Sequence, residues 1–444
     1  YTTHSWVCEG VVYILFLHLI YTLPHKSMKL ALYQHQKDII NDDPKKCGLF
    51  LGCGTGKTLT ALHLARGKTL VVAPKTTRED NTWQRNLALM DNIHSVELLV
   101  VSKEEFRRDH AKLPKCDTFI AEECHTLAGL TPDIRYRKKQ PIPKASQLFE
   151  AVQEYLARAR PERIYTVSAT PTRSPMCVLA IAWMLGKTWD FYQFRNAFYT
   201  EVRLGVRRIW MPKKDQATKD RLGLAVQKLG YTGRMSDYFD VPKQTYVVKN
   251  IEPTAQQHRK IRELAVEYPD PIVLVNKKHQ VEQGVLKGNE FEESQVFETK
   301  KLEAITDLVE EYPKVLIFAK YTEQIYLIRE YLEQTMGIDV YTLTGDTKDR
   351  GTLLKHAEES SRCVVIAQAS ISAGYELPSF RCTVYASMSY SFVDKEQSEW
   401  RTLRSNALDK NIYVYLLCGD VDKAVYKCLL TKKDFHEAQF AKLV

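Results

Sequence analysis

The amino-acid sequence predicts an α/β fold with two parallel sheets in tandem. The first observation is two series of short apolar runs, separated by helix-like or polar segments: residues 47–51, 69–73, 117–121 and 163–168, then residues 314–319, 363–367, 382–386 and 412–416. Such runs are typical of strands in a parallel sheet that is covered on both faces. The second observation is length, because 444 residues exceed one ordinary hydrophobic core.

Composition indicates a globular protein, with 44% hydrophobic and 26% charged residues. The formal net charge of +9 favours a polyanionic partner, although only weakly. Ten cysteines are scattered without a C-x-x-C pair, which indicates neither a disulfide framework nor a zinc module. A reducing, intracellular setting fits this cysteine usage best.

The chain divides into five predicted segments. Residues 1–27 are predicted to be a leader that lies upstream of the native start or is dispensable. Their apolar run at 11–20 is too short to span a bilayer. Residues 28–185 form the first predicted lobe, which opens with an amphipathic helix at 28–40. A linker region with small elements of its own covers 186–246, the second lobe covers 247–430, and a tail covers 431–444.

A glycine-rich turn follows the first apolar run and leads into an amphipathic segment. Glycines let backbone N–H groups turn inward at the positive end of a helix, which makes an anion site. Lys57 can then reach the β- and γ-phosphates of a nucleotide, and the Thr58 hydroxyl can hold Mg²⁺. The expected nucleotide-binding residues are Gly54, Thr55, Gly56, Lys57 and Thr58. A chance lysine in a glycine-rich turn is the alternative, and Leu51 replaces the first glycine of the strict pattern.

A glutamine just ahead of such a turn can hydrogen-bond both the donor and the acceptor edge of adenine. Gln36 is the first choice for this role and Gln34 the second. A solvated helix glutamine is the alternative.

An acidic pair ends the third apolar run. In an ATP-hydrolysing site the first carboxylate orients the Mg²⁺ shell and the second polarises the attacking water. We therefore assign Glu122 to the metal, Glu123 to the water and His125 to coupling with the neighbouring lobe. Glu122 stands where Asp is usual and adds one methylene. An acidic pair after a strand can instead be a solvated loop, but the apolar strand before it favours catalysis.

At this point the chain resembles superfamily 2 helicase-like ATPases over roughly residues 32–417. Eight motifs stand in the expected order, at 54–58, 71–75, 122–125, 168–171, 317–320, 343–346, 372–378 and 397–404. The residues Pro74, Lys75, Trp83 and Gln84 resemble the corresponding motif of the Swi/Snf-type branch. The segment at 239–242 also resembles that branch. The compact form is similar to phage or mobile-element members.

The resemblance implies two RecA-like lobes with an ATP site between them. Gln397, Arg401 and Arg404 match the last motif, whose arginines face the γ-phosphate across the cleft. Gln397 is assigned to nucleotide binding. Trp400 and Glu376 depart from the usual residues, and an amphipathic helix with two surface arginines is the alternative. Ser168 and Thr170 match the motif that links hydrolysis to movement. Contacts with the nucleic-acid backbone are implied for Lys75, Thr76, Lys320, Thr344 and Ser372.

The expected function is an ATP- and Mg²⁺-dependent motor that translocates on nucleic acid, with duplex DNA favoured. We expect a cytoplasmic monomer of a bacterial or phage-infected cell, with a possible protein partner and no membrane. The alternatives are a strand-separating DNA or RNA helicase, the motor subunit of a defence system, and an ATPase-inactive nucleic-acid-binding protein. No wedge or accessory domain is expected.

Two basic stretches lie outside these motifs, at residues 135–139 and 203–214, and each contains aromatic residues. Such stretches can grip a phosphate backbone and stack on a base. A solvated basic loop is the alternative for each.

Overall fold

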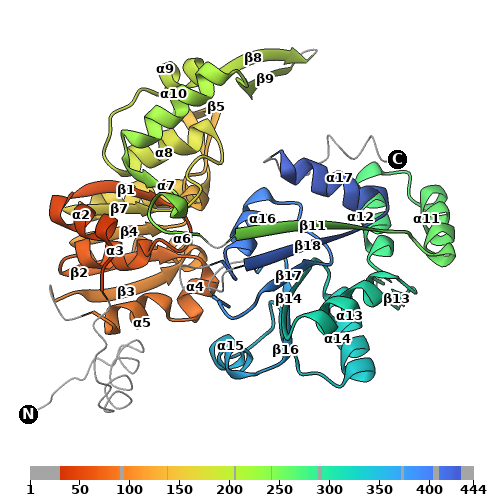
Figure 1. The fold of residues 1–444 in the computed structure, drawn as a ribbon. Helices are drawn as coiled ribbons and strands as arrows, with labels where there is room; N and C mark the ends of the chain where they lie inside the picture. The colour runs from red at the N-terminus through yellow and green to blue at the C-terminus, as the bar shows by residue number, and fades with distance from the viewer. Residues whose placement is uncertain are drawn as a thin grey trace, which may run out of the picture.

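A computed structural model describes residues 31–431 except 91–94, 138, 205–206, 242, 289–292, 372–374 and 404–409. The predicted leader and all but the first residue of the predicted tail lie outside the described residues. Two α/β lobes lie side by side (Figure 1), the first built from the N-terminal half of the chain. Among the described residues, no helix is long and apolar enough to cross a membrane.

The first lobe is built on a six-stranded sheet whose paired strands all run parallel. Its order is β10 (Gly230–Gly233), β1 (Lys46–Leu51), β7 (Arg163–Val167), β4 (Thr118–Glu122), β2 (Lys68–Ala73) and β3 (Glu97–Ser102). Because the strands are parallel, the residues after β1, β2, β4 and β7 meet at one edge of the sheet. This edge carries the predicted motifs of the first lobe.

Helices cover both faces of this sheet. One face packs α2 (Gln34–Asp42), α3 (Lys57–Leu64) and α5 (Thr82–Ala88) around a core that contains Trp83 and Ile120. The other face packs α6 (Lys103–Asp109), α7 (Gln147–Ala159) and α8 (Pro175–Met184). α7 forms because apolar residues recur at helical spacing and because the Ser146 hydroxyl accepts from the Phe149 N–H at its N-terminus. A short helix, α4 (Lys75–Glu79), follows β2.

The second lobe repeats the plan with the strand order β11 (Lys243–Ile251), β18 (Lys410–Cys418), β17 (Cys382–Tyr385), β14 (Lys314–Ala319), β16 (Cys363–Gln368) and β15 (Val340–Leu343). One face packs α13 (Lys301–Glu311) and α14 (Thr322–Met336). The other packs α12 (Pro271–Glu282), α15 (Arg350–Glu359) and α17 (Gly419–Leu430). α11 (Ala255–Glu267), α16 (Phe392–Glu399) and the short pair β12 (Val285–Leu286) and β13 (Gln295–Val296) complete the lobe. The predicted fold of two tandem parallel-sheet lobes is confirmed.

Two parts of the expected linker at 186–246 belong to the sheets. β10 adds to the first sheet beside β1, and β11 opens the second sheet at Lys243 rather than near Val247. β10 escapes sequence analysis because its four residues carry glycine at both ends. The close approach needs these glycines, since a Cβ on Gly230 would lie 2.0 Å from the Gly48 carbonyl oxygen.

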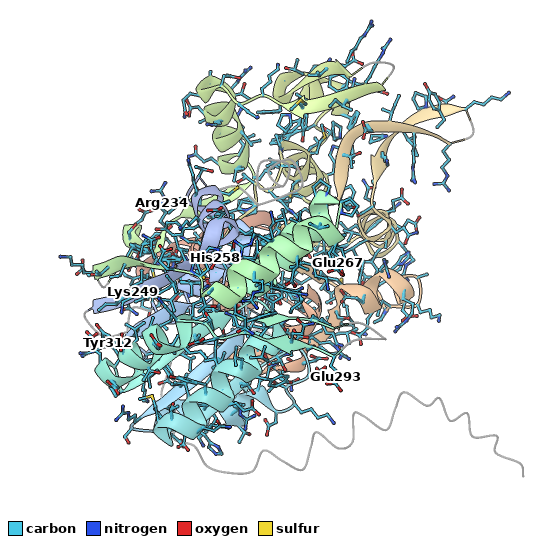
Figure 2. The ribbon with its side chains drawn as sticks, turned by 90° about the vertical axis from the view of Figure 1, so that its right-hand side faces the viewer. Arg234, Lys249, His258, Glu267, Glu293 and Tyr312 are labelled. Atoms are coloured by element: carbon cyan, nitrogen blue, oxygen red, sulfur yellow. The ribbon has the colours of Figure 1, made fainter. Side chains whose placement is uncertain are left out.

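Two hairpins project from the first lobe. One pairs β5 (Leu130–Arg137) with β6 (Gln140–Ala145); the other pairs β8 (Tyr199–Leu204) with β9 (Arg207–Pro212) beside α9 (Phe191–Phe198) and α10 (Gln216–Gln227). Figure 2, where His258 and Glu267 mark α11 of the second lobe, shows both reaching beyond the lobes, β8–β9 at the top and β5–β6 at the upper right. Their strands were overlooked because basic residues and prolines interrupt the apolar pattern.

Candidate functional site

The phosphate loop has the geometry that the sequence predicts. Gly54 and Gly56 adopt positive φ angles of 75° and 77°, a backbone conformation that glycine takes without strain. The Lys57 Nζ lies at the loop mouth and donates to the Gly52 carbonyl oxygen at 2.8 Å. The Thr55 hydroxyl donates to the same oxygen at 2.8 Å, which ties the loop into a closed turn. A glycine turn at the N-terminus of α3 with a lysine facing it fits the phosphates of a nucleotide.

Two side chains of α2 brace this loop from behind. Gln36 is buried; its Nε2 donates to the Gly56 carbonyl at 3.1 Å, and its Oε1 accepts from the Tyr33 N–H at 2.9 Å. His35 donates through Nε2 to the Thr55 carbonyl at 2.9 Å. The helix begins at Gln34 rather than residue 28, and Gln34 itself is exposed and bonded to Asp38. The role of Gln36 in binding adenine stays a prediction; its contact with the loop is a second role that sequence analysis missed.

Glu122 ends β4 and is held by a tryptophan. The fully buried Trp83 donates its indole N–H to the Glu122 Oε2 at 2.8 Å. Burial raises the pKa of Glu122 to about 7, while the indole N–H and the nearby Lys57 act in the opposite direction. The site thus contains a carboxylate and, at the start of α3, the Thr58 hydroxyl. Both are oxygen ligands of the kind that Mg²⁺ prefers, so the donor set fits the metal.

Glu123 is the centre of a polar network within the first lobe. Its Oε2 accepts from the Ser168 hydroxyl at 3.0 Å, and the same hydroxyl lies 2.9 Å from His125 Nδ1. Because Ser168 donates its one hydrogen to Glu123, the network assigns a proton to Nδ1 of His125. Burial lowers the pKa of His125, although Glu123 opposes this, so the imidazole is neutral near pH 7. Glu123 itself has a φ of 45°, which is rare for a residue with a side chain and typical of functional positions.

The second lobe contacts this network directly. Gln397 of α16 donates its Nε2 to the Glu123 Oε1 at 3.3 Å, so the two carboxylate oxygens are held from different lobes. Arg401, one turn later, is buried and donates to the Tyr375 carbonyl at 2.7 Å and the Gln397 carbonyl at 3.0 Å. Its role at the γ-phosphate stays a prediction. Arg404 lies outside the described residues.

The other coupling residue, Thr170, donates its backbone N–H to the Ser168 hydroxyl oxygen at 3.1 Å. Its own Oγ1 is buried and, within the part of the chain that the structure describes, has no hydrogen-bond partner. A buried hydroxyl without a partner is uncommon and marks a position where a partner can arrive.

The predicted backbone contacts occupy different environments. Lys75 is exposed and lies 3.6 Å from Glu79, and Thr76 beside it is half-buried. Lys320 rests its Nζ 2.8 Å from the centre of the Tyr390 ring, and burial lowers its pKa to about 7. Thr344 is buried beside Thr347. Ser372 lies outside the described residues. No contact between these side chains and nucleic acid is tested, so all five assignments stay predictions.

Comparison with known proteins finds a family match for the second lobe. Residues 300–406 match the family model of the helicase conserved C-terminal domain. This span, about a quarter of the chain, includes Lys320, Thr344, Gln397 and Arg401. The match agrees with the predicted helicase-like character of the second lobe. No curated protein matches the chain.

Two solved structures are similar in fold. The SWI2/SNF2 ATPase core of Sulfolobus solfataricus in complex with double-stranded DNA has 15% sequence identity, a TM-score of 0.39, and coverage of 95% of this chain and 94% of that one. The Hef helicase domain of Pyrococcus furiosus has 13% identity, a TM-score of 0.48, and coverage of 88% and 97%. Likeness at this identity concerns the fold alone.

Proposed function

We propose that this chain is an ATP-hydrolysing motor that moves along nucleic acid, with duplex DNA as the favoured track. The observation that carries the proposal is the Glu123 carboxylate, which accepts hydrogen bonds from Ser168 in one lobe and Gln397 in the other. A carboxylate oriented from both sides of a cleft can sense whether the lobes are closed, and hydrolysis can therefore follow their movement.

The phosphate loop and its lysine would bind the nucleotide. Gly54 and Gly56 present backbone N–H groups to the phosphates. The Lys57 ammonium would give up its hydrogen bond to the Gly52 carbonyl and bind the phosphates instead. Thr58 and Glu122 would hold Mg²⁺, which neutralises charge on the phosphates when bound.

Glu123 is the residue that we assign to the attacking water. Its carboxylate orients the water and accepts a proton from it as the water oxygen bonds to the γ-phosphorus. The bond from the γ-phosphorus to the bridging oxygen breaks, so that ADP leaves and the transferred group becomes inorganic phosphate. Ser168 and His125 hold the Glu123 carboxylate in place through their side chains. Arg401 and Arg404 would stabilise the charge on the transferred group when the two lobes close on the nucleotide. Such arginines are worth about 10³–10⁵ in rate in other phosphoryl-transfer enzymes.

The nucleic-acid track is inferred from the motif pattern, which resembles the Swi/Snf-type branch and, in its compactness, phage or mobile-element members. Lys75, Thr76, Lys320, Thr344 and Ser372 are the proposed phosphate contacts. Hydroxyl and ammonium groups bind phosphates without reading bases, which suits a motor that must act on any sequence. A strand-separating helicase is the second candidate, because two hairpins project from the first lobe.

Two variants test the site. Lys57→Ala removes the phosphate-binding ammonium, and Glu123→Gln keeps the shape of the side chain but not its basicity. Steady-state ATP hydrolysis should fall by about 10²-fold or more in each, because each removes a group that acts in the transition state. Equilibrium binding of a fluorescent ATP analogue should weaken in Lys57→Ala and persist in Glu123→Gln. Wild-type hydrolysis by either variant would refute the assignment.

A further inference from the structure

The β5–β6 hairpin carries uncompensated positive charge at its tip. Between residues 130 and 145 the chain has five lysines and arginines and one aspartate. Arg137 and Lys139 flank the turn and are exposed. No hydrogen bond or ion pair of either side chain occurs within the described ranges of the structure. Neither cation therefore has a structural role that would explain it.

An aromatic ring stands beside these cations. Tyr136 is 72% exposed, the highest value for an aromatic residue among the exposed large hydrophobic side chains of the described chain. It pairs across the hairpin with Pro141, whereas Arg137 pairs with Gln140 on the opposite face. The ring and the two cations thus crowd the same end of the hairpin without covering one another.

The base of the hairpin is fixed to the lobe. Leu130 is buried in the core of the first lobe, and Arg135 forms an ion pair with Glu150 of α7. Pro141 and Pro143 remove two backbone donors from β6, and proline at an edge prevents another strand from pairing there. The hairpin is therefore anchored to the lobe near its base, and a partner of its tip would bind through side chains. Along the chain, only residues 124–129 separate the start of the hairpin at Leu130 from Glu123.

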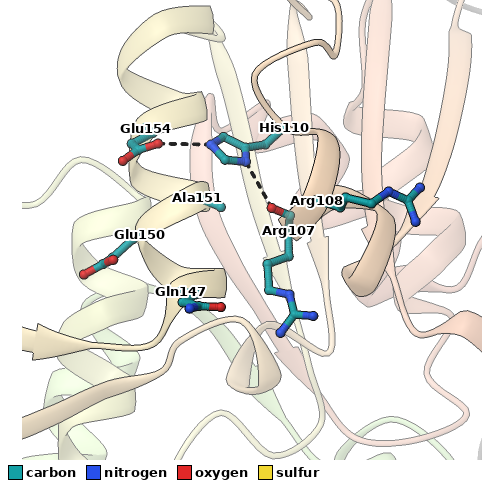
Figure 3. Close-up of a pocket in the computed structure, with 7 residues that line it drawn as sticks. All are labelled: Arg107, Arg108, His110, Gln147, Glu150, Ala151 and Glu154. Carbon is teal, nitrogen blue, oxygen red and sulfur yellow. Dashed lines mark hydrogen bonds and ion pairs between the residues drawn. The ribbon is translucent and has the colours of Figure 1, made fainter.

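A groove between α6 and α7, with a volume of about 430 Å³, is not the proposed binding surface (Figure 3). None of its lining residues belongs to the hairpin, and none is a tyrosine, tryptophan or phenylalanine on which a base could stack. Two of its basic side chains already have partners, because His110 pairs with Glu154 at 3.0 Å and Arg108 with Asp109 at 2.6 Å. Its wall shares Glu150 with the hairpin ion pair.

The second hairpin differs from the first because its aromatic ring and one of its cations have partners. Trp210 of β9 is covered by the Arg195 guanidinium, which lies 3.9 Å from the ring centre. Arg208 lies 3.6 Å from Glu201 on the partner strand. The ring and one cation of β8–β9 thus have partners within the protein, whereas those at the β5–β6 tip do not.

We propose that the β5–β6 tip binds single-stranded nucleic acid, with Tyr136 stacked on an unpaired base and Arg137 and Lys139 on the flanking phosphates. Base–aromatic stacking needs an unpaired base, since the faces of paired bases are covered within a duplex. The proposal rests on the proposed function and narrows its substrate to a duplex that adjoins a single-stranded segment.

The test measures binding of the full chain to three fluorescein-labelled probes by anisotropy: an oligothymidylate, a blunt duplex, and the same duplex with an oligothymidylate overhang. Tyr136→Ala should weaken the first and third probes by on the order of tenfold and the blunt duplex by less than about twofold. Tyr136→Phe should bind like wild type because it keeps the ring. Tyr326→Ala, an exposed tyrosine on α14, is the matched control and should change nothing.

The double variant Arg137→Ala/Lys139→Ala should lower the slope of log affinity against log salt for the oligothymidylate by about 1.4, the value for two lost phosphate contacts. Equal losses on all three probes, or none, would overturn the proposal. ATP hydrolysis is measured in parallel without nucleic acid. One outcome separates the two assignments: Lys57→Ala leaves hydrolysis intact while Tyr136→Ala still weakens binding of the two probes that contain a single strand more than binding of the blunt duplex. In that case the ATPase assignment fails and the hairpin assignment stands.

Discussion

At the scale of single residues, the Glu122 carboxylate depends on a neighbour that was not assigned a role from the sequence. Trp83 was noticed only as part of a motif, yet its indole N–H fixes Glu122. The Glu122 side chain, one methylene longer than Asp, reaches this indole from the end of β4.

Replacing Trp83 by phenylalanine should weaken Mg²⁺ use without unfolding the lobe. The ring stays in the core while Glu122 loses a hydrogen bond to a charged acceptor, an interaction worth about 1.5–3 kcal/mol. We expect the Mg²⁺ concentration for half-maximal nucleotide binding and hydrolysis to rise about tenfold. Trp183→Phe is the control, because Trp183 also donates its indole N–H, to the Trp189 carbonyl, away from the site. An unchanged Mg²⁺ requirement would show that the bond to Glu122 is not used.

At the scale of elements, α16 links the second lobe to the candidate site of the first lobe through Gln397. Sequence analysis identified Gln397 as part of the last motif but assigned it to the nucleotide, whereas the structure gives it a contact with Glu123. The partner of a side chain across two domains depends on how the domains meet, which no local pattern encodes.

Gln397→Ala should therefore slow hydrolysis more than it weakens ATP binding. The variant frees one oxygen of Glu123 and removes a link between the lobes, so kcat should fall about tenfold while the affinity for ATP changes by less than about threefold. Lys395→Ala, on the same helix and paired with Glu399 at 2.8 Å, is the control. A loss confined to ATP affinity would favour the original assignment to the nucleotide.

At the scale of the whole molecule, the two parallel sheets were predictable because the four central strands of each sheet bury short apolar runs. β10 and the hairpins were not, since glycines, prolines and basic residues hide their strands. The interior of the second lobe was equally hidden: Lys301 bonds Asp422 at 2.6 Å, and Asp422 bonds His279 at 3.0 Å. Such a network joins three helices through residues far apart in the sequence.

This network predicts acid sensitivity of the second lobe. Burial lowers the pKa of His279 to about 4, although Asp422 opposes this, and Lys301, Lys320, Glu282, Tyr321 and Tyr390 surround the network. The unfolded chain binds a proton near the ordinary pKa of about 6.5, so the stability from neutral His279 is present above that pH. It is lost as pH falls from about 6.5 to 4, by about 3 kcal/mol.

Chemical denaturation at several pH values measures this loss. His279→Gln should be less stable than wild type at neutral pH and should show a flatter dependence between pH 6.5 and 4. Exposed His258, changed to Gln, is the control, since its removal should leave the pH dependence as it is. A slope that persists in His279→Gln would assign the acid sensitivity to other groups.

The most direct measurement of the central claim is the steady-state ATPase rate of the chain with no polynucleotide, duplex DNA, single-stranded DNA and RNA. A nucleic-acid-driven motor predicts a low basal rate and strong stimulation by DNA, greatest with the duplex. Glu123→Gln should abolish hydrolysis under every condition. Stimulation by RNA or single strands alone would instead indicate a helicase. A rate indifferent to all polynucleotides would contradict the account.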